Sequence, residues 1–148
     1  MIKINSCGGN YLLNVGPDSL GVVPEESIAI LDTVGKYVNA NAEAIFGTLR
    51  MPLYPYELTY GGLTCRPYRL YVHVFRRIPL LELLNITNTI KRAWVVETGE
   101  ELIPRTGATC EGDGFVRVDL PEHLKRSDYY CVALELGEEM PLFHPIRD

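Results

Sequence analysis

The chain has 148 residues, of which 47% are hydrophobic and 22% are charged, and its net charge is −5 at pH 7. This composition excludes a disordered chain, and the length fits one domain or one domain plus part of another. The acidic balance gives no support to nucleic-acid binding, and no apolar run approaches the roughly 18 residues that span a bilayer. We therefore expect a packed chain whose partners include neither nucleic acid nor a membrane.

The chain opens with the pattern of one βα unit. Residues 2–4, Ile-Lys-Ile, fit either a short strand or the remnant of a helix. From Tyr11 to Val15 the chain is almost continuously apolar, which is typical of a strand covered on both faces. Gly-Pro-Asp at 16–18 ends that strand, because proline fixes φ and glycine permits the turn.

A helix is predicted from Pro24 to about Asn39. Proline is tolerated at the first helical position, and the carboxylates of Glu25 and Glu26 favour the positive end of the helix dipole. Spacings of three and four residues place one apolar stripe on this helix, at Ile28, Leu31, Val34, Gly35 and Val38. We expect the stripe to pack on the rest of the chain or on another copy.

Beyond an extended connector at 48–57, the hydrophobic period changes to two. This period predicts short strands separated by Gly, Pro and Asp turn signals. Strands of this length and spacing are typical of a β-sandwich. The predicted strands are 63–66, 69–75, 81–84, 93–97, 101–103, 108–111, 115–119 and 129–136.

The cysteines and histidines give no metal-binding pattern. Cys7, Cys65, Cys110 and Cys131 form no C-x-x-C pair and match no zinc-finger spacing. The three histidines are scattered along the chain, in an apolar strand at 73 and in turn or tail segments at 123 and 144. We expect no metal and no cofactor. The thiols are either four small buried side chains or include at most one cross-strand disulfide.

Two motifs carry a resemblance to a known family. The run GGNYLLNVGP at 8–17, with Gly21 and the Pro-Glu-Glu at 24–26, is similar to the "GGN-LLLN-GP-DG-IP" run of the α-L-fucosidases of glycoside hydrolase family 29. NAEAIFGT at 41–48 is similar to their "NGEAIYGT", although Ala42 stands where the family usually has glycine, which disfavours a left-handed cap. In the family these segments form the last strand and last helix of the catalytic (β/α) barrel.

The rest of the chain is more loosely similar to the family's C-terminal domain, at LYVHVF over 70–75 and VDLP over 118–121. The resemblance implies a mainly β fold in which an antiparallel β-sandwich, residues 51–148, follows a strand–helix remnant of a barrel, residues 1–50. It also implies the non-catalytic C-terminal portion of an enzyme that hydrolyses terminal α-L-fucosides, with the sandwich supporting the barrel.

The family's retaining chemistry uses an aspartate nucleophile and a carboxylic acid/base, both on earlier barrel strands. No residue here matches the surroundings of either group, so the resemblance assigns no catalytic residue and the chain is expected to be inactive alone. Its own carboxylate pairs lie in helix starts and turns, where solvated charge is the ordinary interpretation. These pairs are Glu25/Glu26, Glu100/Glu101, Glu111/Asp113 and Glu138/Glu139.

One position keeps a possible site role. Chemistry in (β/α) barrels takes place at the C-terminal ends of the strands. Asn14 and Asp18 lie there, so in a complete enzyme they would be substrate-binding residues at the pocket rim, although simple turn formation is the stronger interpretation. Tyrosines near the predicted junction, and Trp94, are interpreted as packing rather than as sugar platforms. These tyrosines are Tyr54, Tyr56, Tyr60, Tyr68 and Tyr71.

Several partners remain open at this stage. A bare apolar strand from Tyr11 to Val15 invites pairing with a second copy, so this segment is predicted to be disordered, folded on the sandwich, or exchanged between copies. A separate chain could instead supply the rest of a barrel, and a free-standing carbohydrate-binding or protein-interaction module is the alternative function. Members of the family are typically secreted, periplasmic or lysosomal, whereas the first residues here contain no signal peptide.

Overall fold

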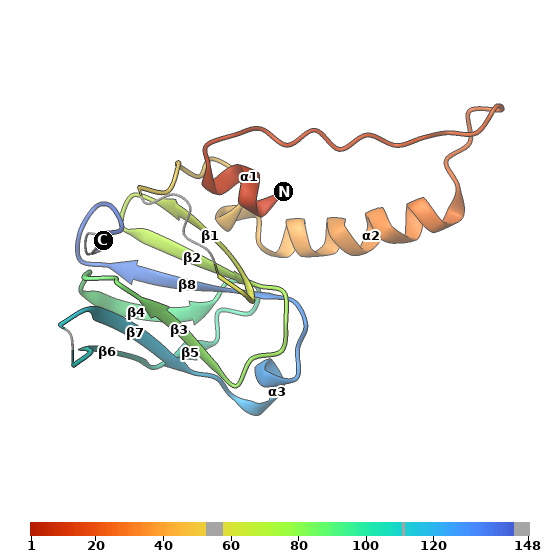
Figure 1. Ribbon diagram of the computed structural model, residues 1–148. Helices are drawn as coiled ribbons and strands as arrows, with labels where there is room; N and C mark the ends of the chain where they lie inside the picture. The colour runs from red at the N-terminus through yellow and green to blue at the C-terminus, as the bar shows by residue number, and fades with distance from the viewer. Residues whose placement is uncertain (53–57, 111, 144–148) are drawn as a thin grey trace.

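The computed structural model describes residues 1–52, 58–110 and 112–143. Most of its regular structure is antiparallel β-sheet, with helices mainly at the N-terminal end (Figure 1). None of the helices in these ranges is long and apolar enough to cross a membrane. The mainly β fold expected from the sequence is therefore confirmed.

Two sheets form the sandwich. The larger sheet has the strand order β1-β2-β8-β4-β5, and the smaller has the order β3-β7-β6. Neighbouring strands pair antiparallel throughout both sheets. The strands are β1 (Gly61–Arg66), β2 (Arg69–Val74), β3 (Leu80–Leu84), β4 (Ile90–Val95), β5 (Glu101–Leu102), β6 (Pro104–Ala108), β7 (Gly114–Asp119) and β8 (Tyr130–Leu136).

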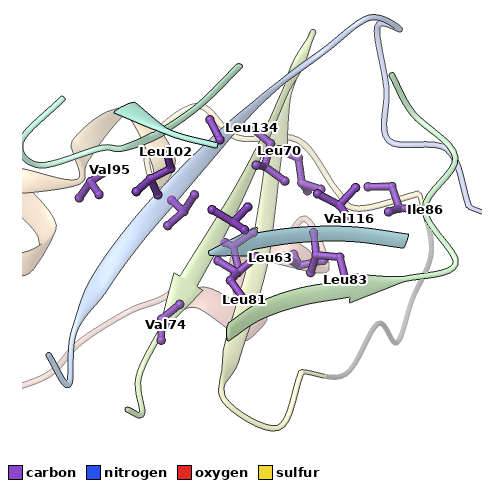
Figure 2. Packing of buried hydrophobic residues seen from close by; sticks show 14 of the residues in the cluster. Leu63, Leu70, Val74, Leu81, Leu83, Ile86, Val95, Leu102, Val116 and Leu134 are labelled. Carbon is purple, nitrogen blue, oxygen red and sulfur yellow. The ribbon is translucent and has the colours of Figure 1, made fainter. Parts of the chain in front are cut away.

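The core lies between the two sheets, as Figure 2 shows. Alternate residues of each strand point inward, so Leu81 and Leu83 of β3 lie opposite Val118 and Val116 of β7. All four are essentially inaccessible to water. The period-two pattern thus predicted the inward faces of these strands correctly, because one face of each strand is buried.

One strand prediction was wrong in position. A strand at 108–111 was expected, but β6 ends at Ala108. The Thr109 amide donates to the Asp113 carbonyl, and the Asp113 amide donates to Thr109 Oγ1, which closes a turn. Gly112 has φ of +88° in this turn, a conformation that favours glycine. Residue 111 lies outside the described residues.

Three helical segments precede the larger sheet in the chain, and a fourth follows β7. The alternative at residues 2–4 is settled in favour of helix α1 (Ile2–Ser6), which packs on β1. Helix α2 (Glu25–Ala40) confirms the predicted helix within one residue. The 3₁₀ turn η1 (Ala42–Ala44) follows it without a left-handed residue, as expected for alanine at 42. Helix α3 (Glu122–Lys125) precedes β8.

The predicted strand from Tyr11 to Val15 does not form. The segment is extended but makes no backbone ladder with the described residues, and Leu12 is 91% exposed. A strand needs neighbours to satisfy its amides and carbonyls, and no described strand lies beside this one. Folding onto the sandwich, one of the three predicted outcomes, is therefore not observed.

Candidate functional site

Residues 9–36 form an arm that projects from the sandwich (Figure 1). We use the word arm for this range, which comprises the extended segment 9–24 and most of α2. Helix α2 contains no buried residue, and its predicted stripe residues Ile28 and Val34 are 52% and 40% exposed. The stripe is therefore not buried on the sandwich, and its packing on another copy, the other expected outcome, stays a prediction.

The exposed apolar surface is concentrated at this end of the chain. Of the 18 large hydrophobic side chains that are exposed among the described residues, 11 lie before residue 48. Single exposed apolar residues are ordinary, but contiguous apolar surface marks a place where something else binds. The arm therefore has the character of an interface.

A groove of about 1040 Å³ lies beside the arm, between α1, α2 and the edge of the larger sheet. Its walls are mostly apolar, with Ile4 from α1 and Ile30 and Val34 from α2. At the mouth of the groove the rings of Phe75 and Tyr129 lie 6.4 Å apart.

Helix α1 is fixed to the edge of the groove by close packing. Ile2 is buried against β1, and a Cβ at Gly62 would lie 2.9 Å from Ile2 Cγ2. The Met51 amide also donates to the Ser6 carbonyl at 2.8 Å. This wall of the groove is therefore anchored to the sandwich, whereas the α2 wall is not.

The predicted rim residues serve their own loop. The Asp18 carboxylate accepts hydrogen bonds from the amides of Leu20 and Val22 at 2.8 and 2.9 Å, and Asn14 Oδ1 accepts from the Val15 amide at 3.0 Å. Such side-chain to backbone bonds are typical of turn residues. The structure thus brings Asn14 and Asp18 to one exposed segment, and among the described residues the hydrogen bonds of both side chains go to backbone amides of that segment.

The carboxylate pairs do not converge. Glu101 accepts from Arg92, and this hydrogen bond lowers the pKa of Glu101. Glu138 accepts from Asn88 Nδ2 and the Thr89 amide, and the Asn88 bond is the main cause of its lowered pKa. These roles are structural.

The carboxylates of the remaining pairs also do not come together in one site. Glu100 pairs with His123 at 2.9 Å, Glu25 and Glu26 occupy the first turn of α2, and Glu111 lies outside the described residues. The described residues also contain no cluster of three metal-ligating side chains.

The aromatic residues divide between core and surface. Trp94 is 8% exposed, and the Cζ atoms of Arg69 and Arg92 lie over its ring, 4.7 and 4.8 Å from the centroid. Tyr71 is buried and Tyr60 packs against the core, so the packing interpretation is confirmed for these three. Tyr68 is exposed, and Tyr54 and Tyr56 lie outside the described residues. All four cysteines are free, with Cys65 and Cys131 buried.

A buried polar network under α2 was not predicted. His73 of β2 is fully buried, and its Nδ1 lies 2.7 Å from the Tyr37 hydroxyl. Its Nε2 lies 3.0 Å from Thr64 Oγ1 and 3.2 Å from the Ala44 carbonyl. Thr64 Oγ1 donates to that same carbonyl at 2.5 Å. A histidine and a threonine on the outward face of apolar strands were the only sequence signals of this network.

The comparisons with known proteins bear on both ends of the chain. The family model for alpha-L-fucosidase matches residues 1–43. An α-L-fucosidase of Dictyostelium discoideum is 42% identical over 48 residues, which are 32% of this chain and 10% of that protein. A putative α-L-fucosidase of Caenorhabditis elegans is 49% identical over 43 residues, 29% of this chain and 9% of that one.

The sandwich is matched through its fold. The crystal structure of the α-L-fucosidase of Vibrio sp. strain EJY3 covers 97% of this chain with a TM-score of 0.77 and 26% identity. This chain is related to the α-L-fucosidases. α-L-Fucosidase isoenzyme 1 of Paenibacillus thiaminolyticus covers 93% of the chain with a TM-score of 0.76, also at 26% identity.

The match accounts for only part of each fucosidase. The chain corresponds to about a tenth of the curated relatives, and to 25% and 33% of the Vibrio and Paenibacillus proteins. The fucosidase sequence match falls on α1, the arm and the end of α2, which is where the exposed apolar side chains gather. The fucosidase-like fold extends through the sandwich.

Proposed function

We propose that this chain is the non-catalytic C-terminal portion of an α-L-fucosidase-like glycoside hydrolase. Residues 1–50 contribute the last βα unit of its catalytic barrel, and residues 51–148 form the sandwich that supports it. In the complete enzyme the reaction is hydrolysis of terminal α-L-fucosides, with both catalytic carboxylates supplied by the remainder of the barrel.

The observation that carries the proposal is the contrast between the two parts. The sandwich buries its own core, whereas the arm carries an extended apolar segment and a helix without buried residues. A βα unit is stable when its strand is paired and both faces are covered, as in a parallel barrel. The arm therefore has the features of an element whose neighbours are other βα units.

In this proposal Asn14 and Asp18 stand at the pocket rim, because they follow the segment that would become the last barrel strand. The partner of the arm is the remaining barrel, on the same polypeptide or on another. Exchange of residues from Tyr11 to Val15 between two copies is the competing way to pair that segment. Pairing with the remaining barrel should give an active complex with one copy of this chain, whereas exchange should give an inactive dimer of this chain.

A complementation experiment tests the proposal. The D. discoideum α-L-fucosidase, truncated at the start of the segment that matches this chain, is mixed with this chain, and hydrolysis of an aryl α-L-fucoside is followed. We expect this chain alone to show no turnover and the mixture to recover activity. Turnover by the repurified chain alone would contradict the non-catalytic role, and a mixture with no complex and no activity would contradict the proposal that residues 1–50 complete the barrel.

A matched pair of variants sharpens this test. Leu12→Lys places a charge on the segment that would enter the barrel, where Leu12 is now 91% exposed. Ile103→Lys places the same charge at a 75% exposed position of the sandwich. We expect Leu12→Lys to abolish complementation and Ile103→Lys to preserve it. Equal effects would show that the arm is not the contact.

A carbohydrate-binding module is the second candidate. The observation in its favour is the aromatic pair at the mouth of the groove, since Tyr129 is 61% exposed and contacts Phe75. Aromatic faces stack on sugar rings. Titration of the chain with L-fucose and fucosylated oligosaccharides, followed by NMR shifts, tests this. Saturable shifts that Tyr129→Ala removes would favour the module.

A further inference from the structure

Helix α2 reaches the sandwich through its C-terminal end. Tyr37, in the last turn of the helix, packs its ring against His73 and Phe75, with centroids 6.1 and 5.7 Å away. Its hydroxyl is the polar contact, 2.7 Å from His73 Nδ1. The preceding turns expose Ile30 and Val34, whereas Tyr37 contributes a hydrogen bond and two ring contacts to β2 and the residue that follows it.

When His73 is neutral, each hydrogen bond of this network has one donor and one acceptor. The Thr64 hydroxyl donates to the Ala44 carbonyl, which leaves Thr64 Oγ1 free to accept from His73 Nε2–H. His73 Nδ1 is then unprotonated and accepts from the Tyr37 hydroxyl. We assign the Nε2–H tautomer from this pattern, because each ring nitrogen then has a partner of opposite kind.

A second proton on the ring breaks this arrangement. Protonated His73 has a donor at Nδ1, which faces the hydroxyl that was donating to it. Tyr37 must turn its own proton away, and the cation sits at a position with no access to water. Moving α2 away restores water to the Nδ1 side of the ring.

We propose that His73 and Tyr37 form an acid-sensitive latch, which holds the C-terminal end of α2 on the larger sheet while His73 is neutral and releases it when His73 is protonated. Release opens the α2 wall of the groove and uncovers Cys131, which lies opposite His73 in the register of β2 and β8. This inference is independent of the proposed function.

Two groups beside His73, the Cys131 thiol and the Tyr37 hydroxyl, do not change their protonation in mild acid. Cys131 is fully buried, which raises the pKa of its thiol, and burial also raises the pKa of Tyr37. Both stay protonated in acid. The carboxylates of Glu43 and Glu97 face this cluster and add to those two shifts, but neither accepts a hydrogen bond from the ring.

The expected size of the effect follows from linkage. Burial lowers the pKa of His73 from 6.5 to about 4, whereas a ring exposed by release titrates near 6.5. The released fraction therefore rises up to about tenfold for each pH unit below 6.5, and levels off below pH 4. The full change is roughly 300-fold in the equilibrium constant.

Thiol labelling measures the release. In a Cys7→Ser/Cys110→Ser background the remaining thiols are Cys131, under the latch, and Cys65, in the core between the sheets. A pyridyl disulfide, which reacts with thiols in acid, is applied between pH 7 and pH 4, and rates are divided by those of the urea-unfolded chain. We expect Cys131 labelling to accelerate with acid while Cys65 stays protected.

Two histidine variants decide whether His73 is the cause. His73→Gln keeps a donor and an acceptor but cannot titrate, so Cys131 labelling should lose its pH dependence. His123→Gln removes an exposed histidine and should leave the profile unchanged. A pH dependence that persists in His73→Gln, or Cys65 and Cys131 labelling in parallel, would overturn the latch.

If His73→Gln fails to fold, NMR of the native His73 side chain tests the latch instead. The ring nitrogens of His73 are followed by ¹⁵N NMR in the same background and again with Tyr37→Phe. We expect His73 to stay neutral well below pH 6.5, and to gain its proton at a higher pH once the Tyr37 hydroxyl is gone. Titration near pH 6.5 with both hydroxyl and helix in place would refute the proposal.

Discussion

Replacing Leu81 by alanine tests whether the sandwich is the stable part of this chain. Leu81 is fully buried in β3, opposite Val118 of β7. The change removes three carbon atoms, worth about 2.4 kcal/mol at about 0.8 kcal/mol each, and leaves a cavity that adds to the loss. We expect the free energy of unfolding to fall by about 3–4 kcal/mol, within the ~2–5 kcal/mol range of such substitutions.

The matched control is Leu12→Ala in the arm. The same three carbons are removed where the side chain is 91% exposed, so the expected change is within about 0.5 kcal/mol. Guanidinium chloride unfolding followed by Trp94 fluorescence reports both variants, because Trp94 is the one tryptophan of the chain and lies on the larger sheet. A loss above about 1 kcal/mol at Leu12, or below it at Leu81, would refute this division of stability.

Three further predictions concern the residues Tyr130, Gly61 and His73. Tyr130→Phe removes a buried hydroxyl that has no hydrogen-bond partner among the described residues, so thermal unfolding should show a gain of about 1 kcal/mol rather than a loss. Gly61→Ala should destabilise the chain or prevent folding, because a Cβ at Gly61 collides with the His73 carbonyl, whereas the control Gly16→Ala, at an exposed position where a Cβ meets no atom within 4 Å, should have little effect. Between pH 6.5 and 4 the unfolded chain protonates His73 and the folded chain with its latch closed does not, so stability should fall as the pH falls, by up to about 3 kcal/mol, and His73→Gln should flatten that slope in urea titrations.

The sandwich could be predicted from the sequence because its signals are local. Alternating burial in β3 and β7 follows their alternating apolar residues, and Gly or Pro residues mark the turns between strands. The misplaced strand at 108–111 shows the limit of this reasoning. Thr109 and Asp113 close the turn through a side chain, and a hydrophobic pattern carries no information about that hydrogen bond.

The arm could be predicted only in part, for a different reason. Helix α2 was expected correctly because proline, acidic residues and a period near 3.6 act within one segment. The segment from Tyr11 to Val15 has the apolar run of a strand, but a strand exists only through bonds to its neighbours. The Tyr37–His73 contact joins residues 36 positions apart, and neither residue type distinguishes such a pair from ordinary packing.

The same contact links the fold to the proposed role. An isolated helix of 16 residues is marginally stable in water, and α2 receives little from the sandwich except at Tyr37. The exposed stripe of α2 must gain its burial from another surface if the helix is to contribute to a stable enzyme. A helix held at one end through Tyr37 can change its angle when another surface covers the stripe. Two contacts therefore determine the position of the arm relative to the sandwich. One is the Tyr37–His73 latch, and the other is the surface that covers the stripe of α2.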